Sequence, residues 1–501
     1  MKKHFLLLLA LVISASAVFA SCSESGNTEK SGSETTLVGD ETSPTAVDET
    51  SASAEETEAD LIDVLSKNFT PELKAELELD GYESRVFLRQ EGYEWSNPDI
   101  VAEEQTGERL NDAVYNRNLY LEDTYGFTIM ASYSEWDCSE LTILAASGDD
   151  IYDMVFPMAR TAASMAQAGV LIDLNTVPYL DFDNPTWSRM FIDLLKLDGK
   201  LYYAAGDISV NSLQAVIAML FNKQMVSNYH LSDPYTLVRE GSWTLDNFKT
   251  MCTTAAEDLN GDGNRTPEDQ WGMILQSSKG GIAFYYGCDE HLVDLNEEEI
   301  PHLSAGNERS VNVYKKIQEL VYDKSSVYEG GDYETLGIFA EGRSLFTPQA
   351  LFHTITLREA ETEFGIVPMP KYDTEQDEYV QCADGWCISP LVIPAIVENI
   401  KRAGFIAEAF AEASSVMVKP EYYEIILKSK LTRDQESAEM LDIIYKNFVV
   451  DPADLYQWGG LEESIIKSMR NGQEISSVVA KGRRLITKNM ENTLNEFAAH
   501  N

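Results

Sequence analysis

The sequence predicts an α/β protein whose hydrophobic core is too large for one small domain. Strand and helix patterns alternate from Tyr82 onward, and this alternation is typical of parallel sheets with right-handed crossover helices. The chain has 501 residues, of which 44% are hydrophobic, so it can bury a large core. Single cores stop growing near about 250 to 300 residues. We therefore expect two or three domains, or one large two-lobed unit.

The first predicted elements follow one another in regular order. Apolar residues alternate with polar ones in the strand segments and recur at helical spacing in the helix segments. These patterns predict strands at 84–88, 127–133 and 152–156, and helices at 110–125 and 140–146. In an open sheet of this kind, ligands bind beyond the carboxyl ends of the strands. The loop 157–161 is therefore a candidate binding rim, and a plain turn into the next helix is the alternative.

Two later strands and one helix start are also predicted. Apolar runs indicate a strand at 215–221 and a short strand at 387–389. Thr244 is a plausible N-cap because threonine oxygens accept the free N–H groups of a helix start, and Asn247 follows three residues later.

The first 22 residues are typical of an export signal. Lys2 and Lys3 give a positive start, and an apolar run follows over residues 5–20. This run is shorter than the roughly 20 residues that a membrane-spanning helix needs. The ending Phe19-Ala20-Ser21-Cys22 resembles the lipobox of bacterial lipoproteins, with Phe19 in place of the usual leucine. The resemblance implies a lipid-modified (palmitate-bearing) Cys22 that anchors the protein to the cell membrane. An ordinary cleaved secretory signal is the alternative.

The segment 23–80 is predicted to be a disordered acidic tether. Its first part is rich in Ser, Thr, Glu and Asp and has almost no large apolar residues. Such a composition buries too little surface to offset the entropy lost on ordering. No later stretch has 18 uninterrupted apolar residues, so we expect no membrane-spanning segment after the signal. Because of the export signal, we expect the folded part to lie outside the cytoplasm, held at the membrane by its anchor.

Charge and cysteine content exclude some classes of protein. The 38 basic and 83 acidic residues give a net charge of −45, which would repel nucleic acid. The five cysteines after Cys22 are odd in number and widely spaced, which is not a disulfide framework. Cys382 and Cys387 could form a pair, but buried free thiols are the simpler interpretation.

Several segments are distinctive in combination. They are GDDIYDMV at 148–155, LDGKLYY at 197–203, LFNK at 220–223, GSWTLDNF at 241–248, FAEGR at 339–343, FGIVPMP at 364–370 and GWCIS at 385–389. In this order, the chain from about 80 to 500 resembles the family 1 extracellular solute-binding proteins of bacterial ABC importers, which mostly carry oligosaccharides. No single segment is specific, so the resemblance rests on their joint order behind a lipobox and an acidic linker.

The resemblance implies a fold and a domain division. The expected fold is the type II periplasmic-binding-protein fold, with two α/β lobes, a hinge crossed more than once, and a ligand cleft between the lobes. Residues 81–207 and 383–450 are expected in the N-terminal lobe, and residues 208–382 and 451–501 in the C-terminal lobe. The implied function is reversible binding of a sugar or oligosaccharide by a monomeric receptor, which delivers it to an ABC permease.

A calcium-like loop lies at 258–269. Oxygen-bearing side chains occupy positions one, three, five and nine, Gly263 occupies position six, and the carbonyl of position seven completes the set that calcium prefers. Position twelve is an aspartate instead of the longer glutamate. The sequence predicts structural calcium here, with a self-hydrogen-bonded turn as the alternative. The candidate ligands are Asp258, Asn260, Asp262, Asn264, Thr266 and Asp269.

Sugar recognition needs aromatic faces for the C–H side of the ring and fixed polar groups for the hydroxyls. Position in the predicted fold selects a few candidates among many aromatic residues. Trp386 precedes a predicted hinge crossing, Trp136 follows the second strand, and Arg160 offers a fork of donors on the candidate rim. Further candidates flank the first crossing or lie in the second lobe and near the C-terminus: Ser212, Gln214, Tyr285, Tyr286 and Trp458.

The main alternatives are an enzyme and an adhesin. The chain contains no G-x-S-x-G, H-E-x-x-H, G-x-x-x-x-G-K-[ST] or G-x-G-x-x-G motif, so nucleophile, zinc and phosphate chemistries are poorly supported and we expect no catalytic residues. A surface glycoside hydrolase needs only two carboxylates, and the 83 acidic residues give no selection among candidates. That hydrolase is the second hypothesis, and a non-transport, carbohydrate-binding adhesin is the third.

Overall fold

The computed structural model describes residues 68–90, 99–148, 150–428 and 435–500. The predicted signal peptide and Cys22 lie outside these residues, as does most of the predicted tether. The tether prediction is wrong at its end, because the helix α2 (Pro71–Glu76) forms there and Leu77 and Leu79 are fully buried. These leucines supply the apolar surface that the Ser- and Glu-rich part lacks. No helix in the described ranges is both long and apolar enough to cross a membrane.

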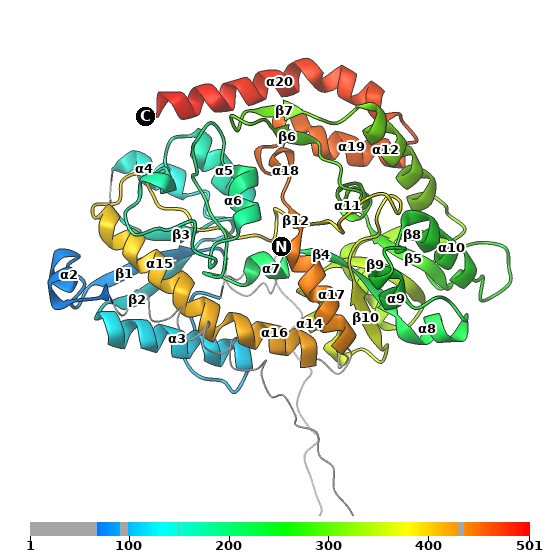
Figure 1. Cartoon of the computed structure of the whole chain (residues 1–501), viewed down its shortest axis with the longest axis horizontal. Coiled ribbons are helices and arrows are strands. Elements are labelled where there is room, and N and C mark those ends of the chain that lie inside the picture. Colours follow the sequence, from blue (N-terminus) through cyan, green and yellow to red (C-terminus); the bar gives the residue numbers. More distant parts are fainter. Residues whose placement is uncertain (1–67, 91–98, 149, 429–434, 501) are drawn as a thin grey trace, which may run out of the picture. The chain divides into compact units, whose positions relative to one another are not determined.

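The first α/β part is built on a parallel sheet with the strand order β2-β1-β3 (Figure 1). Val86 and Leu88 of β1 point to one face and Phe87 to the other, as the two-residue period of a strand requires. One face packs against α3 and the helix α15, which contributes Phe405 and Phe410 to the same core. The elements are β1 (Glu83–Leu88), α3 (Arg109–Tyr125), β2 (Thr128–Tyr133), α4 (Leu141–Ser147), β3 (Met154–Phe156), α5 (Ala159–Gln167), α6 (Arg189–Leu195), α15 (Ile400–Met417) and α16 (Lys419–Lys428).

The second α/β part is built on a five-stranded mixed sheet with the order β10-β4-β9-β5-β8. β5 pairs in parallel with β8 and β9, whereas β4 is antiparallel to β9 and β10. Every residue of β4 is buried, which explains its continuous apolar run. The strands are β4 (Ile217–Asn222), β5 (Trp271–Gln276), β8 (Val327–Gly330), β9 (Ser344–Ala350) and β10 (Phe364–Val367), with a separate hairpin of β6 (Val293–Leu295) and β7 (Pro301–Leu303).

The helices of the second part follow these strands along the chain. Thr244 is the N-cap residue of α10, as predicted, although its side chain makes no capping hydrogen bond. The helices are α7 (Asn211–Gln214), α8 (Lys223–Asn228), α9 (Pro234–Arg239), α10 (Leu245–Ala255), α11 (Gly280–Gly287), α12 (Glu308–Val321), α13 (Asp332–Ala340), α14 (His353–Thr356) and α17 (Gln435–Lys446). α17 packs against β10, so it goes with the second part, although the expected lobe boundary at 450 assigns it to the first.

Three chain segments meet where the chain passes between the two sheets. The short strands β11 (Gln381–Cys382) and β12 (Phe448–Val449) pair in parallel, and Ala383 bridges Val216 just before β4. The chain therefore crosses at three neighbouring places, as expected for a hinge. The strand predicted at 387–389 is wrong: a turn covers 385–387, where Gly385 packs directly against the helix α18 (Pro452–Tyr456).

The C-terminal segment contacts elements of both parts. α18 (Pro452–Tyr456) packs against α5 and β6, α19 (Leu461–Arg470) against α11 and α12, and α20 (Ile475–Ala499) against α5, β7 and α12 (Figure 1). The five described cysteines are buried and free, which confirms the simpler interpretation of their spacing.

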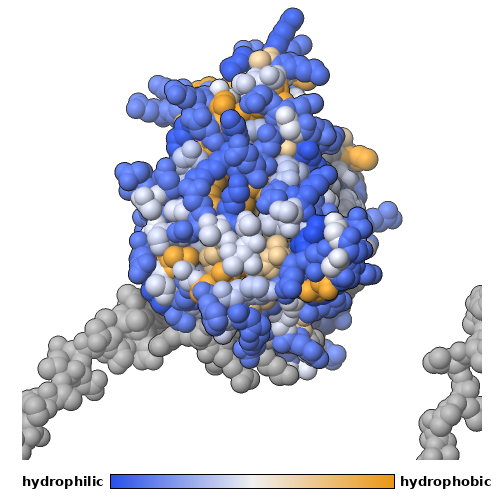
Figure 2. Space-filling model, turned by 90° about the vertical axis from the view of Figure 1, so that its right-hand side faces the viewer, coloured by the Kyte–Doolittle hydropathy of each residue, from blue (hydrophilic) through white to orange (hydrophobic). Residues whose placement is uncertain are grey.

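Most of the protein surface visible from the side of α8 and α10 is hydrophilic. Figure 2 shows hydrophobic residues on this face only as small separate spots. Such scattered apolar residues are normal on a soluble surface and do not form a docking patch.

Candidate functional site

A cavity of about 790 Å³ lies at the carboxyl ends of strands from both sheets. Arg160 enters it from the first turn of α5, the helix after β3, and Lys279, Asp332 and His353 enter it from the segments after β5, β8 and β9. This is the edge of an open α/β sheet where ligands bind. The volume is in the range of small-molecule sites, about 300 to 1,000 Å³.

Trp386 presents an exposed aromatic face to this cavity. The exposed fraction of its side chain is 41%, although its backbone is held on both sides. Its N–H donates to Asp384 Oδ1 at 3.0 Å, and its carbonyl accepts from Arg89 Nη1 at 2.9 Å. The guanidinium carbon of Arg160 lies 5.1 Å from the indole centroid, within the range of a cation–π contact. The indole is therefore pre-positioned and accessible.

The turn before Trp386 requires glycine because α18 approaches the backbone closely. A Cβ atom at Gly385 would come within 2.6 Å of Leu455 Cδ2 and 2.9 Å of Asp454 Oδ2. Instead, the Gly385 N–H donates to Asp454 Oδ2 at 3.2 Å. The helix α18 thus fixes the position of the tryptophan that follows.

Tyr333 is a second aromatic residue of the cavity. It lies at the start of α13, directly after Asp332, and its exposed fraction is 77%. Together with Trp386, it gives the cavity two accessible ring faces on different segments. Flat apolar rings of this kind suit the C–H face of a sugar.

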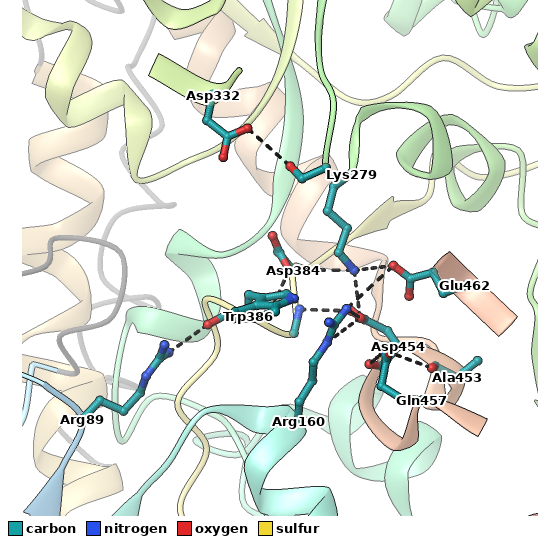
Figure 3. A network of polar contacts seen from close by, with 12 residues as sticks. Arg89, Arg160, Lys279, Asp332, Asp384, Trp386, Ala453, Asp454, Gln457 and Glu462 are labelled. Atoms are coloured by element: carbon teal, nitrogen blue, oxygen red, sulfur yellow. Dashed lines mark hydrogen bonds and ion pairs between the residues drawn. The ribbon is translucent and has the colours of Figure 1, made fainter. Parts of the chain in front are cut away.

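A buried network of charged groups forms one wall of the cavity (Figure 3). Lys279 Nζ lies 2.8 Å from Asp454 Oδ1 and 2.6 Å from Glu462 Oε1. Arg160 donates to the same Asp454 oxygen through Nε at 3.1 Å and also through Nη2. Asp384 lies 3.8 Å from Lys279 Nζ. The network joins α5, α11, α18 and α19, and we call it the charged wall.

The protonation of the charged wall follows from burial and pairing. Burial opposes the charge on Asp454, but Lys279 and Arg160 outweigh it and hold the pKa of Asp454 well below its usual range. Burial raises the pKa of Glu462, and the negative charge of Asp454 raises it further. Burial alone would lower the pKa of Lys279, but Asp454 and Glu462 raise it. Asp454 is therefore the permanent anion of the wall, and Glu462 is the group that holds a proton most readily.

Gln457 completes this side of the cavity in a strained conformation. Its φ is +50°, in the left-handed region that non-glycine residues rarely adopt. Its amide Nε2 donates to the Asp454 carbonyl, while the residue lines the cavity. Strained backbone of this kind is concentrated at functional sites.

The structure brings two of the predicted ligand-binding residues, Arg160 and Trp386, to the cavity. Trp136 follows β2 as predicted and is 42% exposed, but it is not among the cavity-lining residues. Trp458 is buried, stacks on Tyr456 and donates to Thr493 Oγ1 at 2.9 Å, so it is a core residue.

The other four predicted ligand-binding residues are buried outside the cavity lining. Ser212 and Gln214 lie in α7, where the Ser212 hydroxyl donates to the Ser209 carbonyl. Tyr285 and Tyr286 lie in α11, and the Tyr285 hydroxyl is paired with Ser310 Oγ at 2.7 Å. The glycine turn before the tyrosines is instead the start of α11, which brings Lys279 to the cavity.

Six residues of the cavity and its charged wall were not predicted from the sequence: Lys279, Asp332, Tyr333, Gln457, Asp454 and Glu462. Two of these carried a usable signal, because Lys279 and Asp332 each follow a strand and begin a helix. Asp454 and Glu462 carried none, since nothing in the sequence marks them among 83 acidic residues.

The loop 258–269 is held by its own hydrogen bonds. Asp258 accepts from the N–H groups of Gly261 and Gly263, both at 2.8 Å. Asp269 accepts from the N–H groups of Leu259 and Thr266 at 3.0 and 2.7 Å. Across the described part of the chain, no three His, Cys, Asp or Glu side chains gather into a metal-ligand set. This arrangement has the features of the self-hydrogen-bonded alternative, and calcium binding by the loop stays a prediction.

Comparison with known proteins identifies relatives of this chain. Residues 118–394 match the family described as bacterial extracellular solute-binding protein. No curated protein matches the chain.

Three solved structures share the fold at low sequence identity. An ABC substrate-binding protein from Listeria monocytogenes in complex with cycloalternan has a TM-score of 0.53 at 14% identity, covering 82% of this chain and 100% of that chain. The maltose/maltodextrin-binding domain from Bdellovibrio bacteriovorus bound to maltotriose gives the same values. A cyclo/maltodextrin-binding protein complexed with maltotetraose has a TM-score of 0.54 at 12% identity, covering 84% and 97%. These likenesses confirm the predicted two-lobed α/β fold.

Proposed function

The chain belongs to the family of bacterial extracellular solute-binding proteins, and on that premise we propose that it is the receptor of an ABC importer for a sugar or oligosaccharide. It binds the solute reversibly outside the cytoplasm and delivers it to membrane permease subunits driven by a separate ATPase. No bond of the solute is made or broken. The ligand shifts the receptor toward its closed form by contacting both lobes at once.

The observation that carries this proposal is the cavity with two accessible aromatic rings and a polar wall. Trp386 and Tyr333 can cover the C–H faces of a sugar ring, while Gln276, Gln457 and Asp384 can pair with its hydroxyls. Arg160 comes from the first part and Lys279 from the second, so a bound ligand meets both.

The lipid anchor on Cys22 is part of the same proposal. The apolar run before Cys22 and the acidic residues after it support an acylated N-terminus followed by a tether. Metabolic labelling with a fatty acid should mark the wild-type protein, and Cys22→Ser should remove the label and release the protein from membranes.

The test of the function is a thermal-shift screen of residues 23–501 against neutral and amino sugars, with and without calcium. We expect at least one saccharide to raise the melting temperature with one-to-one stoichiometry and to be recovered unchanged. Formation of shorter saccharides during incubation would support the glycoside hydrolase instead. Stabilisation only by peptides or polyamines would contradict the sugar ligand.

A further inference from the structure

His353 is a buried polar residue of the cavity whose ring nitrogens are not used by the protein. It lines the cavity from the start of α14, the short helix after β9, and the residue is 9% exposed. Among the described residues, none forms a hydrogen bond or an ion pair with its imidazole. Neither ring nitrogen belongs to the side-chain atoms that are enclosed without a partner, so both remain accessible. The imidazole therefore offers two nitrogens to the cavity.

The backbone around His353 is fixed before any ligand binds. The N–H of Leu351 donates to the Val216 carbonyl at 3.0 Å, next to the first crossing between the sheets. The N–H of Phe352 donates to the Gln214 carbonyl, also at 3.0 Å. The Phe352 ring packs against the imidazole, with 4.1 Å between the two ring centroids. A side chain held in this way loses little conformational entropy when a ligand binds.

The imidazole of His353 is uncharged near neutral pH, because burial lowers its pKa to about 4. An uncharged imidazole carries one N–H donor and one acceptor nitrogen. A sugar hydroxyl also donates and accepts, so the ring can pair with hydroxyls in either sense. Carboxylates only accept, and ammonium or guanidinium groups only donate, so neither kind of group offers this choice.

The cations of the cavity are already engaged by the protein. Each of the four that line it forms an ion pair with a carboxylate: Arg160, Lys279, Lys467 and Arg470. A ligand that used these cations would compete with the ion pairs, whereas His353 gives up no hydrogen bond to the described residues when it binds a ligand. A buried polar group without a partner is unfavourable, and a ligand hydroxyl would supply that partner.

We propose that His353 is a specificity-determining residue, whose imidazole forms hydrogen bonds with hydroxyl groups of the bound saccharide. This inference rests on the proposed function and names a residue that selects among saccharides. A saccharide with a missing or misdirected hydroxyl leaves the ring nitrogens buried and unpaired, so the cavity binds it more weakly. Stacking on Trp386 and Tyr333 does not supply this selection, because ring faces contact the C–H groups of a sugar.

The test compares saccharides that differ at one hydroxyl. The pairs are glucose with galactose, glucose with mannose, glucose with 2-deoxyglucose, glucose with 6-deoxyglucose, cellobiose with lactose, and maltose with its 4′-epimer. Binding to the mature protein, residues 23–501, is measured by calorimetry near neutral pH. We expect the wild-type protein to bind one member of at least one pair about tenfold or more tightly than the other.

Substitutions assign the selection to His353. His353→Phe keeps an aromatic ring but removes both nitrogens, and it should reduce the ratio of affinities within that pair by about tenfold. His353→Gln restores a donor and an acceptor, so it should keep more of the ratio than His353→Phe. His302→Phe replaces an exposed histidine of β7 and should leave the ratio unchanged.

A measurement on the wild-type protein covers the case in which neither His353 variant folds. In protein labelled with ¹⁵N-histidine, the tighter-binding member of the pair should shift the ring-nitrogen signals of a histidine that remains uncharged at about pH 6. The absence of such a shift would overturn the inference.

The outcomes separate the inference from the function it rests on. A ratio that both His353 variants retain would overturn the role of His353 and leave the sugar receptor standing, and so would equal binding within every pair. Equal binding by His353→Phe and His353→Gln would assign the residue to packing instead. Binding of no saccharide, in these pairs or in the thermal-shift screen, would overturn the proposed function together with the inference.

Discussion

Trp386 and Trp136 are nearly equally exposed, at 41% and 42%, yet only Trp386 lines the cavity. The backbone of Trp386 is held by Asp384 and Arg89, and the Arg160 guanidinium lies over its indole, so both the backbone and the ring have contacts at the cavity. A large aromatic ring kept at the surface by this many contacts indicates a binding role.

Trp386→Ala should weaken sugar binding by about tenfold, because it removes the stacking face but few core contacts. The free energy of unfolding should change by less than about 1 kcal/mol. Trp136→Ala is the matched control, and it should alter neither quantity. Calorimetry gives the affinity and urea unfolding gives the stability. A large loss of stability at unchanged affinity would assign Trp386 to the core.

Arg160 could be predicted because it follows a strand whose carboxyl end lies at the sheet edge. Trp386 was predicted because it precedes an expected hinge crossing, and it lines the cavity although the strand expected there is a turn. Prediction failed for Trp458, whose indole turns toward α20 from a segment with no strand pattern. The partners Lys279 and Glu462 are 183 residues apart, so no local signal could bring them together. The strands of the first sheet were predicted to within two residues, since hydrophobic periodicity is a local property.

At the scale of elements, the charged wall joins four helices, three of them through the carboxylate of Asp454 and the fourth through Glu462. The carboxylate of Asp454 in α18 forms ion pairs with Lys279, at the start of α11, and with Arg160 of α5. Lys279 also forms an ion pair with Glu462 of α19. Removing one partner of a buried ion pair is costly, because the remaining charges lose their compensation.

Asp454→Asn should therefore lower the free energy of unfolding by about 3 to 5 kcal/mol. The control is Glu463→Gln on the neighbouring helix, where the pair with Lys467 is exposed to solvent and should contribute little. Denaturant unfolding at neutral pH measures both variants. Equal losses in the free energy of unfolding for the two variants would show that the charged wall does not stabilise the packing of these helices.

Gly385→Ala tests the close approach of α18 to the turn. The added methyl group would overlap Leu455 and Asp454, so the turn or the helix must shift. We expect a loss of about 1 to 3 kcal/mol in stability, together with weaker sugar binding because Trp386 moves with the turn. Gly331→Ala is a suitable control, because a Cβ atom there meets no atom within 4 Å. Full stability in Gly385→Ala would contradict the packing described here.

At the scale of the whole molecule, stability should depend on pH through buried carboxyl groups. Glu408 of α15 accepts from Trp187 Nε1 at 2.9 Å and Asn184 Nδ2 at 3.0 Å. Burial raises the pKa of Glu408 from 4.5 to about 7, and these hydrogen bonds only partly oppose the shift. The folded chain thus keeps a proton that the unfolded chain releases near pH 4.5.

The contribution of Glu408 is full below about pH 4.5 and is lost as the pH rises through about 7. Its size is at most about 3.5 kcal/mol, since one pKa unit corresponds to about 1.4 kcal/mol. Glu408→Gln should flatten this part of the stability profile, whereas Glu491→Gln at an exposed position should not. Melting temperatures between about pH 5 and 8 report the effect. An unchanged slope in Glu408→Gln would contradict it.

The connection between the sheets is slender, with β11 and β12 contributing two residues each. Gln381 N donates to the Asn447 carbonyl at 3.0 Å and Ala383 N to the Val449 carbonyl at 2.9 Å. Each such hydrogen bond between peptide groups contributes only about 1 kcal/mol net, so the pairing of β11 with β12 adds little stability to this joint. In the receptor proposed above, bending at this joint would break few hydrogen bonds, so a bound sugar could hold the two lobes closed and its release would let them open again.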